Sequence, residues 1–321
     1  MISIHGPQGH DTRNVLSVRI GSAPCSFGVD EIAPPGAWMP EPDELLSWLA
    51  DLGYQGTELG PPGYFPKGAE FRSQLARRNL GLIAAFFPLR LSYAEFADED
   101  RQWLRNAIEI VRSASPTTSS PIAMISDGID EPLRQRISGR VHEHPEARLS
   151  TARFETLVDN LHRAADLCLE LGLEAVVHPH AGTYLETADE IHRLMERLDG
   201  SLVGLCLDTC HLRFGGGDPI EFASMYSQAI RHVHLKDCDA TILQRVIDSG
   251  GSFTDAVAAG VFVDLGRGDS RVAEVLAVLR HYGYSGWMVV EQDRFLGPAD
   301  TRAAIIDSQR RNMQFLRTLG L

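Results

Sequence analysis

Short apolar runs alternate with amphipathic stretches along almost the whole chain. Eight of the runs are predicted to be strands, at residues 18–21, 55–59, 82–87, 121–125, 174–178, 202–207, 231–235 and 287–291. The stretches with helical periodicity lie at residues 44–52, 69–79, 93–113, 151–171, 188–198, 219–229, 271–282 and 299–319. Such alternation is typical of a parallel sheet covered by helices. Because there are eight strand–helix units, we expect a single (β/α)8 TIM barrel rather than an open sheet.

We expect one domain over residues 1–321, because no stretch has the composition of a linker. Residues 1–16 precede the first predicted strand as an N-terminal extension. Two long insertions interrupt the alternation, at residues 113–150 and 238–270. Both flank strand ends on the side where the active sites of such barrels lie, so we expect them to form walls or lids of a site. Plain surface decoration is the alternative.

Four predicted strands end in a residue that a divalent metal ion would accept as a ligand, namely His178, Asp208, His234 and Glu291. The carboxyl ends of the strands surround the active site in an eight-stranded α/β barrel, so these side chains are expected to point at one place. Imidazole combined with carboxylate suits Mn, Co, Fe or Zn, whereas oxygen ligands alone would suit Mg or Ca better. The sequence therefore predicts a divalent metal site, with manganese first and Co, Fe, Zn or Mg as alternatives.

Composition and charge exclude several classes of protein. The chain is 44% hydrophobic and 23% charged, as globular proteins are, and its net charge is -13 without any block of Lys or Arg. Because nucleic acid requires a basic footprint, no such partner is expected. No apolar run is long enough to span a bilayer, and the start of the chain does not resemble a signal peptide. Five cysteines without paired spacing indicate a reducing compartment, so we expect a cytoplasmic protein without membrane association.

Three strand-end segments resemble the xylose isomerase-like barrel superfamily, which includes sugar isomerases, ketose 3-epimerases, an endonuclease for abasic DNA and inosose dehydratases. These segments are residues 204–211, 232–237 and 289–293. The inosose dehydratase branch is resembled more closely by three further segments, residues 178–187, 56–60 and 260–262. The resemblance runs over most of residues 17–319. It implies a TIM barrel with long loops at the catalytic face and a bound metal ion.

In that superfamily the metal ion is typically held by Glu, Asp, His and Glu. Asp208, His234 and Glu291 match three of these ligands. The first Glu normally ends the fifth strand, where this chain has His178 instead. The resemblance therefore leaves the fourth ligand open between His178 and Glu186. Glu186 lies in the loop that follows and stands just before a predicted helix cap.

Lys236 and His180 are candidate catalytic groups because of the strand face on which they lie. Lys236 follows His234 by two residues and His180 follows His178 by two, so each shares a strand face with a predicted ligand. A cation at Lys236 would stabilise an enolate oxygen or act as an acid. Its alternative is a salt bridge to Asp237 or Glu58. His180 is a candidate base.

Three other residues complete the predicted catalytic set. His211 lies three residues after Asp208, and the resemblance implies that it contacts the substrate; the alternative is an ordinary loop histidine. Glu58 ends the second predicted strand and is expected to face the same cavity or to act as a structural partner. His144 lies in the first insertion, where it is either exposed to solvent or a base on a lid.

Four residues are candidates for contact with the substrate. Arg267 lies in a glycine-rich loop and is predicted to hold a hydroxyl or carboxylate group, or else to anchor its loop. Cys25, Phe27 and Trp38 follow the first strand and are expected to line the mouth of the site, with packing as the alternative.

These features together predict a metal-dependent enzyme that removes a proton next to a ketone and stabilises the resulting enediolate. The leading hypothesis is an inosose dehydratase-like lyase acting on a keto-polyol or keto-sugar, with 2-keto-myo-inositol as the first substrate to try. One alternative is a keto-sugar epimerase or isomerase. Another is the metal-binding catalytic subunit of a C-glycoside deglycosidase acting on 3-oxo-glycosides, which would need a small partner subunit. A non-catalytic sugar-binding barrel is the non-enzymatic alternative, and a homo-oligomer is compatible with each hypothesis.

Overall fold

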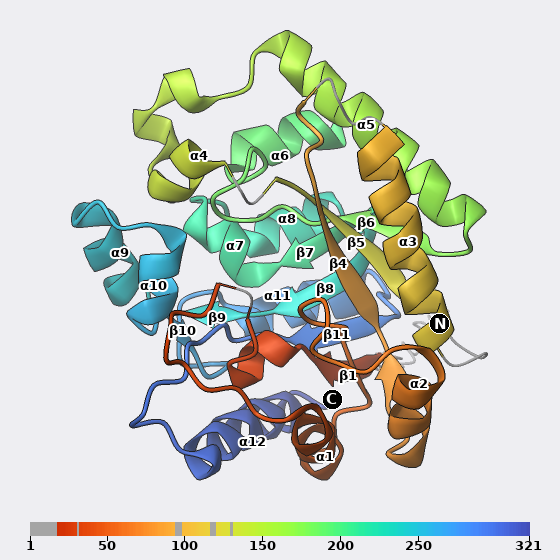
Figure 1. Ribbon diagram of the computed structural model, residues 1–321. Coiled ribbons are helices and arrows are strands. Elements are labelled where there is room, and N and C mark those ends of the chain that lie inside the picture. Colours follow the sequence, from red (N-terminus) through yellow and green to blue (C-terminus); the bar gives the residue numbers. More distant parts are fainter. Residues whose placement is uncertain (1–17, 31, 94–97, 116–119, 129–130) are drawn as a thin grey trace, which may run out of the picture.

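A computed structural model describes residues 18–30, 32–93, 98–115, 120–128 and 131–321, and it shows a parallel sheet surrounded by helices (Figure 1). The sheet has nine parallel strand segments in these residues, in the order β3-β2-β1-β11-β8-β7-β6-β5-β4. Their bounds are β1 (Arg19–Ser22), β2 (Gly56–Thr57), β3 (Gly81–Leu82), β4 (Ala84–Leu89), β5 (Ile122–Asp127), β6 (Glu174–Val177), β7 (Val203–Asp208), β8 (Ile230–Leu235) and β11 (Trp287–Val290).

The third strand position is interrupted at Ile83, and this residue closes the ring. β3 pairs with β2, whereas β4 pairs with β5. The N–H of Ile83 donates to the carbonyl of Thr57 at 2.9 Å, and the carbonyl of Ile83 accepts from Ile122 at 2.9 Å. β3 and β4 therefore occupy one position, so eight strand positions surround the axis. The predicted fold class, a (β/α)8 barrel, is confirmed.

Eight helices lie where helical periodicity predicts them. They are α1 (Pro42–Leu52), α2 (Gly68–Arg77), α3 (Asp98–Ala114), α5 (Thr151–Glu170), α6 (Ala188–Met195), α8 (Pro219–Met225), α11 (Val272–His281) and α12 (Arg302–Thr318). In α1 the apolar stripe buries Leu45 and Leu49 against the sheet side, as amphipathic spacing requires. Thr187 begins α6 with a capping box to Glu190, which satisfies N–H groups at the helix start. Across the described residues, no helix combines the length and apolar character that a bilayer crossing requires.

The amino-terminal end of the barrel is filled by Trp287, the first residue of β11. A Cβ atom at Gly56 would lie 2.9 Å from the indole, and one at Gly81 would lie 3.3 Å from it. The two glycines therefore make the room that the ring occupies. Met124 and Val176 pack in the same interior cluster. This apolar layer closes one end of the barrel and leaves the carboxyl ends of the strands for a site.

The two insertions contain elements of their own. In the first lie α4 (Pro132–Arg136) and 3-10 turns at Val141–Glu143 and Pro145–Ala147; residues 116–119 and 129–130 lie outside the described residues, as does the predicted extension at 1–16. The second contains α9 (Ala240–Asp248) and α10 (Phe253–Ala258) between the antiparallel strands β9 (Asp237–Cys238) and β10 (Phe262–Val263). Its apolar residues pack against α7 (Thr209–Phe214), beside the end of β7.

Candidate active site

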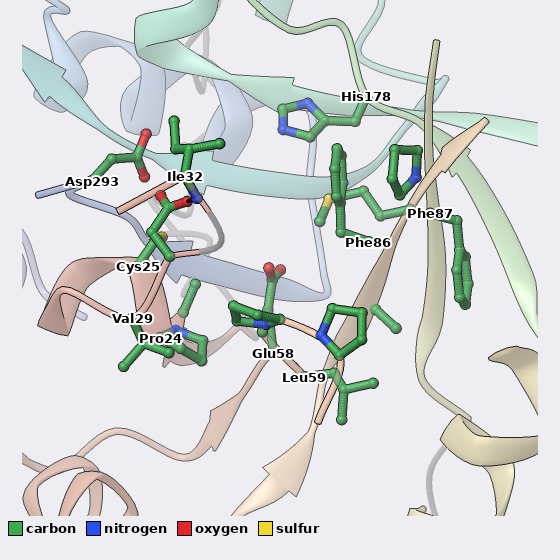
Figure 2. A pocket seen from close by; sticks show the side chains of 18 of the residues that line it. Pro24, Cys25, Val29, Ile32, Glu58, Leu59, Phe86, Phe87, His178 and Asp293 are labelled. Atoms are coloured by element: carbon green, nitrogen blue, oxygen red, sulfur yellow. Dashed lines mark hydrogen bonds between the residues drawn. The ribbon is translucent and has the colours of Figure 1, made fainter. Parts of the chain in front are cut away.

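A cavity of about 620 Å³ opens at the carboxyl ends of the strands. Glu58 follows β2, His178 follows β6, Lys236 follows β8 and Glu291 follows β11, and all four line the cavity. Figure 2 shows the carboxylate of Glu58 and the ring of His178 directed into this space from opposite sides. The polar side chains thus gather at the end of the barrel where parallel strands present their final residues to one centre.

Three of the predicted metal ligands meet at the ends of β7, β8 and β11. Asp208, His234 and Glu291 each offer a ligand atom within 4.8 Å of the other two, and all three residues are buried. His234 Nδ1 lies 3.4 Å from Asp208 Oδ2 and 3.2 Å from Glu291 Oε2. One imidazole nitrogen and two carboxylate oxygens form a donor set that suits a divalent transition metal.

Three buried atoms at this cluster have no hydrogen-bond partner among the described residues: His178 Nδ1, His234 Nδ1 and Asp208 Oδ2. The remaining atoms of two of these side chains are held in place. Asp208 Oδ1 accepts two N–H groups at the start of α7, each at 2.8 Å, and His234 Nε2 donates to Glu58 at 3.1 Å. Because buried polar atoms are nearly always paired, three buried polar atoms without a hydrogen bond among imidazoles and carboxylates fit a bound cation.

Of the two candidates for a fourth ligand, His178 lies at the cluster and Glu186 does not. The ring centroid of His178 is 4.9 Å from that of His234. The carboxylate of Glu186 accepts the backbone N–H groups of Gly182 at 2.5 Å and Gly139 at 2.7 Å. Glu186 therefore holds the loop after β6 against the first insertion. This geometry contradicts the prediction of Glu186 as a metal ligand.

Lys236 supplies a buried positive charge to the same cluster. Its Nζ lies 2.7 Å from Glu291, 3.1 Å from Asp293 and 3.6 Å from Asp208, and the residue is 1% exposed. Burial by itself would lower the pKa of Lys236. The three carboxylates outweigh burial and raise the pKa of Lys236 well above its usual range, so the side chain stays an ammonium group.

Asp237 and Glu58, the alternative partners predicted for Lys236, are engaged elsewhere. Asp237 accepts N–H groups of the glycine-rich loop at 2.9 and 3.0 Å. Glu58 accepts from His232 at 2.8 Å and from His234 at 3.1 Å. Burial would raise the pKa of Glu58, but His234 and His232 outweigh it and lower this pKa. Glu58 is therefore a carboxylate that orients the ring of His234 and leaves its Nδ1 turned to the cluster.

His180 and His211 lie against each other beside the cluster, with ring centroids 3.8 Å apart. His180 Nδ1 donates to the carbonyl of Ala181 at 2.8 Å, which leaves its Nε2 as an acceptor. His211 Nδ1 lies 3.2 Å from the N–H of Ala181, and its Nε2 lies 3.3 Å from Lys236 Nζ. A neutral imidazole ring has one acceptor nitrogen, so His211 accepts a hydrogen bond either from the N–H of Ala181 or from Nζ of Lys236, but not from both at once. Burial is the main cause that lowers the pKa of both rings, so both are neutral near physiological pH.

Among the predicted substrate-binding residues, Cys25 lines the cavity. Phe27 is fully buried and packs near Trp48 of α1, with ring centroids 6.2 Å apart. Trp38 donates from Nε1 to the carbonyl of Gly297 at 3.1 Å. Neither Phe27 nor Trp38 is among the described residues that line the cavity. Their predicted contact with the substrate is therefore wrong, and their packing alternative holds.

Arg267 and His144 also lie away from the cavity. The side chain of Arg267 is 66% exposed and lies 4.0 Å from Asp264. The side chain of His144 is 33% exposed and pairs with Glu146 at 3.1 Å. Neither lines the cavity within the described part of the chain. This placement contradicts the prediction of Arg267 as a substrate ligand and of His144 as a base, because the loops that carry them present these side chains to solvent.

Two site residues that sequence reasoning missed obey a simple spacing rule. Asp293 lines the cavity and pairs with Lys236, and it follows Glu291 by two residues. His232 donates to Glu58 and precedes His234 by two. Because side chains two apart in an extended segment share a face, this alternation was a usable signal for both residues.

Aromatic residues near the imidazoles had no such signal. The ring centroid of Phe253, from α10, lies 5.1 Å from that of His180, and that of Phe86, from β4, lies 6.3 Å from it. Both line the cavity. In sequence they cannot be told from aromatic residues of the core, since only packing brings α10 over the strand ends.

Comparison with known proteins places the chain in a family. Residues 46–319 match the xylose isomerase-like TIM barrel family. The chain belongs to that family. An L-ribulose 3-epimerase of known structure has the same fold, with a TM-score of 0.66 at 15% sequence identity and coverage of 94% of both chains.

Relatives of higher sequence identity include inosose dehydratases and a rhizopine catabolism protein. An inosose dehydratase of Geobacillus kaustophilus (strain HTA426) is 35% identical over 288 residues, which cover 88% of this chain and 89% of that protein. The rhizopine catabolism protein MocC of Rhizobium meliloti is 31% identical over 282 residues, covering 88% of this chain and 83% of that protein. This xylose isomerase-like barrel is thus an enzyme of the dehydratase or isomerase/epimerase kind.

Proposed function

We propose that this barrel is a metal-dependent lyase that removes water from a cyclic keto-polyol or keto-sugar. This is the kind of reaction that the name inosose dehydratase describes. The observation that supports the proposal most is the cluster of three buried polar atoms without a hydrogen bond, on His178, His234 and Asp208, beside an ammonium group and a neutral imidazole. Such a centre combines charge stabilisation with a proton acceptor, which is what deprotonation next to a carbonyl requires.

Asp208, His234, Glu291 and His178 would hold the metal ion, with manganese as the first candidate and Co, Fe, Zn or Mg as alternatives. When bound, such an ion supplies a Lewis acid that lowers the cost of negative charge on substrate oxygens. Glu58 keeps His234 in the orientation that this binding needs, because it accepts the hydrogen of Nε2.

His180 is the proposed base. Its ring lines the cavity, its Nδ1–H is anchored on Ala181, and its Nε2 is left to take the proton from the carbon next to the carbonyl. Lys236 stabilises the negative charge that develops on the carbonyl oxygen, and His211 contacts Lys236 beside it. When the electron pair returns, a carbon–carbon double bond forms and the bond to the β-hydroxyl breaks. The departing hydroxide takes the proton from His180, so one water molecule leaves and the enzyme is restored.

The test is incubation of manganese-loaded protein with 2-keto-myo-inositol in heavy water, followed by mass spectrometry. Loss of one water from the substrate is expected, and His180→Gln should slow it by about 100-fold or more while the metal content stays the same. Deuterium uptake without loss of water would instead identify an epimerase or isomerase. If a panel of keto-sugars neither exchanges nor loses water, the sugar-binding alternative replaces the lyase.

Metal variants test the ligand set separately. Asp208→Asn and Glu291→Gln are expected to lose bound manganese, measured by elemental analysis after gel filtration. Glu186→Gln is the matched control, because this carboxyl group is equally buried but bound to backbone N–H groups. Undiminished water loss in a metal-free variant would contradict metal-dependent catalysis.

All five cysteines are free. Thiols without disulfides suit a reducing compartment, so we place the proposed reaction in the cytoplasm.

A further inference from the structure

The cavity extends well beyond the polar site. Its volume of about 620 Å³ lies within the range of roughly 300–1,000 Å³ that is typical of pockets for drug-sized ligands. The part away from the imidazoles is lined mainly by apolar side chains. We call this part the apolar arm, and the residues that define it are Pro61, Pro62, Phe65, Phe87, Trp103 and Ile110.

A break in the barrel wall lets the cavity reach this arm. Phe86 and Phe87 are successive residues of β4, so their rings lie on opposite faces of the strand, as Figure 2 shows. Both rings line the same cavity, which therefore passes round the edge of β4. The opening exists because β2 is two residues long. Beyond the bond from Leu59 N to Ala84 O at 2.9 Å, this edge of β4 has no further backbone partner among the described residues.

Helix α3 provides one side of the arm with two large apolar side chains that the core leaves exposed. One stripe of this helix, with Leu104, Ile108 and Val111, is fully buried in the main core. A second stripe lines the cavity at helical spacing and consists of Trp103, Ala107, Ile110 and Ala114. In that second stripe Trp103 is 43% exposed and Ile110 is 40% exposed. Two large apolar side chains left open in a continuous groove indicate a ligand rather than a packing role.

The shape of the arm specifies the chemistry of that ligand. Phe87 and Trp103 meet edge to face with ring centroids 6.2 Å apart, and Pro61 and Pro62 line the same cavity. Aromatic walls of this kind favour an aromatic ring, because pairs of rings gain stabilisation beyond the area that they bury. Lys67 also lines the cavity near this segment, and its side chain is exposed. A polyol with hydroxyl groups alone would not match the apolar walls of the arm.

We propose that the substrate is a keto-sugar or keto-cyclitol that carries an aromatic substituent. The polyol ring lies at His180 and Lys236, and the substituent passes the edge of β4 into the apolar arm. This inference rests on the proposed function for the reacting ring, but the contact made by the substituent is a separate physical claim. Because that contact is remote from the reacting carbon, it contributes binding that a bare polyol lacks.

The experiment compares two substrates that share one reacting ring, methyl 3-keto-β-glucoside and phenyl 3-keto-β-glucoside. Manganese-loaded protein is incubated with each in heavy water. Proton removal at the reacting carbon is measured as kcat/KM for deuterium uptake plus aglycone release, because the group β to the ketone in both compounds is the aglycone oxygen. The phenyl compound is expected to be favoured by at least about tenfold, since even one methylene in a fitted apolar pocket gives about 10- to 200-fold. Trp103→Ser and Ile110→Ser should each reduce this ratio toward one.

Leu169→Ser is the matched control. Leu169 is a large apolar residue of α5 that is 59% exposed, and it is not among the described residues that line the cavity. Its replacement should leave the phenyl-to-methyl ratio unchanged. A ratio at or below one in the unmodified protein overturns the inference while leaving the proposed function intact.

A binding measurement separates the two claims if no keto-sugar reacts. Calorimetry with the unreactive phenyl and methyl β-glucosides then decides the inference by itself. Tighter binding of the phenyl compound that Trp103→Ser abolishes supports the arm, and equal binding overturns it. Self-association through the exposed stripe of α3 would also overturn the inference. In that case sedimentation would show an oligomer that Trp103→Ser dissociates, while the phenyl-to-methyl ratio stays unchanged.

Discussion

Replacing Lys236 with methionine is expected to destabilise the metal-free protein strongly and the manganese-loaded protein much less. Lys236 is 1% exposed, and its ammonium group lies 2.7, 3.1 and 3.6 Å from three carboxylates. Methionine fills a similar volume without charge, so the carboxylates remain buried beside one another with no lysine to balance them. Removing one partner of a buried ion pair typically costs about 3–5 kcal/mol.

This cost converts into a measurable shift of the melting temperature. At roughly 2.1 cal/mol/K per residue, the unfolding entropy of a chain of 321 residues is about 0.7 kcal/mol/K, so the expected drop is about 4–7 °C in chelator-treated protein. Manganese supplies positive charge to Asp208 and Glu291 themselves. It should therefore raise the melting temperature of the variant by several degrees more than that of the unmodified protein.

The assay is differential scanning calorimetry of both proteins with chelator and with excess manganese. Lys67→Met is the matched control, since Lys67 is the other lysine of the chain and its side chain is exposed. A variant as stable as the unmodified protein in chelator would refute Lys236 as the charge partner of this cluster. Equal stabilisation of both proteins by manganese would refute the view that lysine and metal ion act on the same carboxylates.

Three further predictions concern groups outside the cluster. Burial raises the pKa of Asp127 from 3.8 to about 7, so the free energy of unfolding should fall by about 4 kcal/mol as pH rises from about 4 to about 7. In urea unfolding, Asp127→Asn should depend less on pH and be more stable than the unmodified protein above pH 7. Identical curves for the two proteins would contradict this. Burial also raises the pKa of Glu186 from 4.5 to about 7, so the stability of the unmodified protein should fall as pH rises through this range; urea unfolding of Glu186→Gln should show a weaker pH dependence, and an unchanged dependence would contradict this. His144→Ala should leave kcat/KM unchanged, because this side chain lies away from the cavity, and a tenfold loss would restore it as a base.

The order of strands and helices follows from local properties of the chain. Apolar runs bounded by glycine and amphipathic stretches with capping residues specify their own secondary structure, as Thr187 does at the start of α6. Eight such units leave few ways to bury every apolar face, and the barrel is one of them. The grouping of Asp208, His234 and Glu291 follows in turn, because parallel strands bring their carboxyl ends together.

Details of the barrel wall cannot be predicted in this way, because short strands contain too few residues to show a hydrophobic pattern. The break at Ile83 and the two-residue length of β2 lie where Gly56 and Gly81 pack against Trp287. No periodicity signals that the edge of β4 is left open. The path of the cavity past Phe86 and Phe87 is a consequence of that edge, so it becomes visible only in three dimensions.

By itself the sequence determined the fold class, the end of the barrel that carries the chemistry and the ligand types gathered there, since each depends on residues close together in the chain. Tertiary structure alone placed His178 at the cluster and Glu186 away from it, and set the partners of Lys236. It also decided that Arg267 and His144 face away from the site, while Phe253 faces it. These outcomes depend on how loops pack on distant strands. Such contacts balance burial against hydrogen bonding over the whole molecule, so no local pattern encodes them.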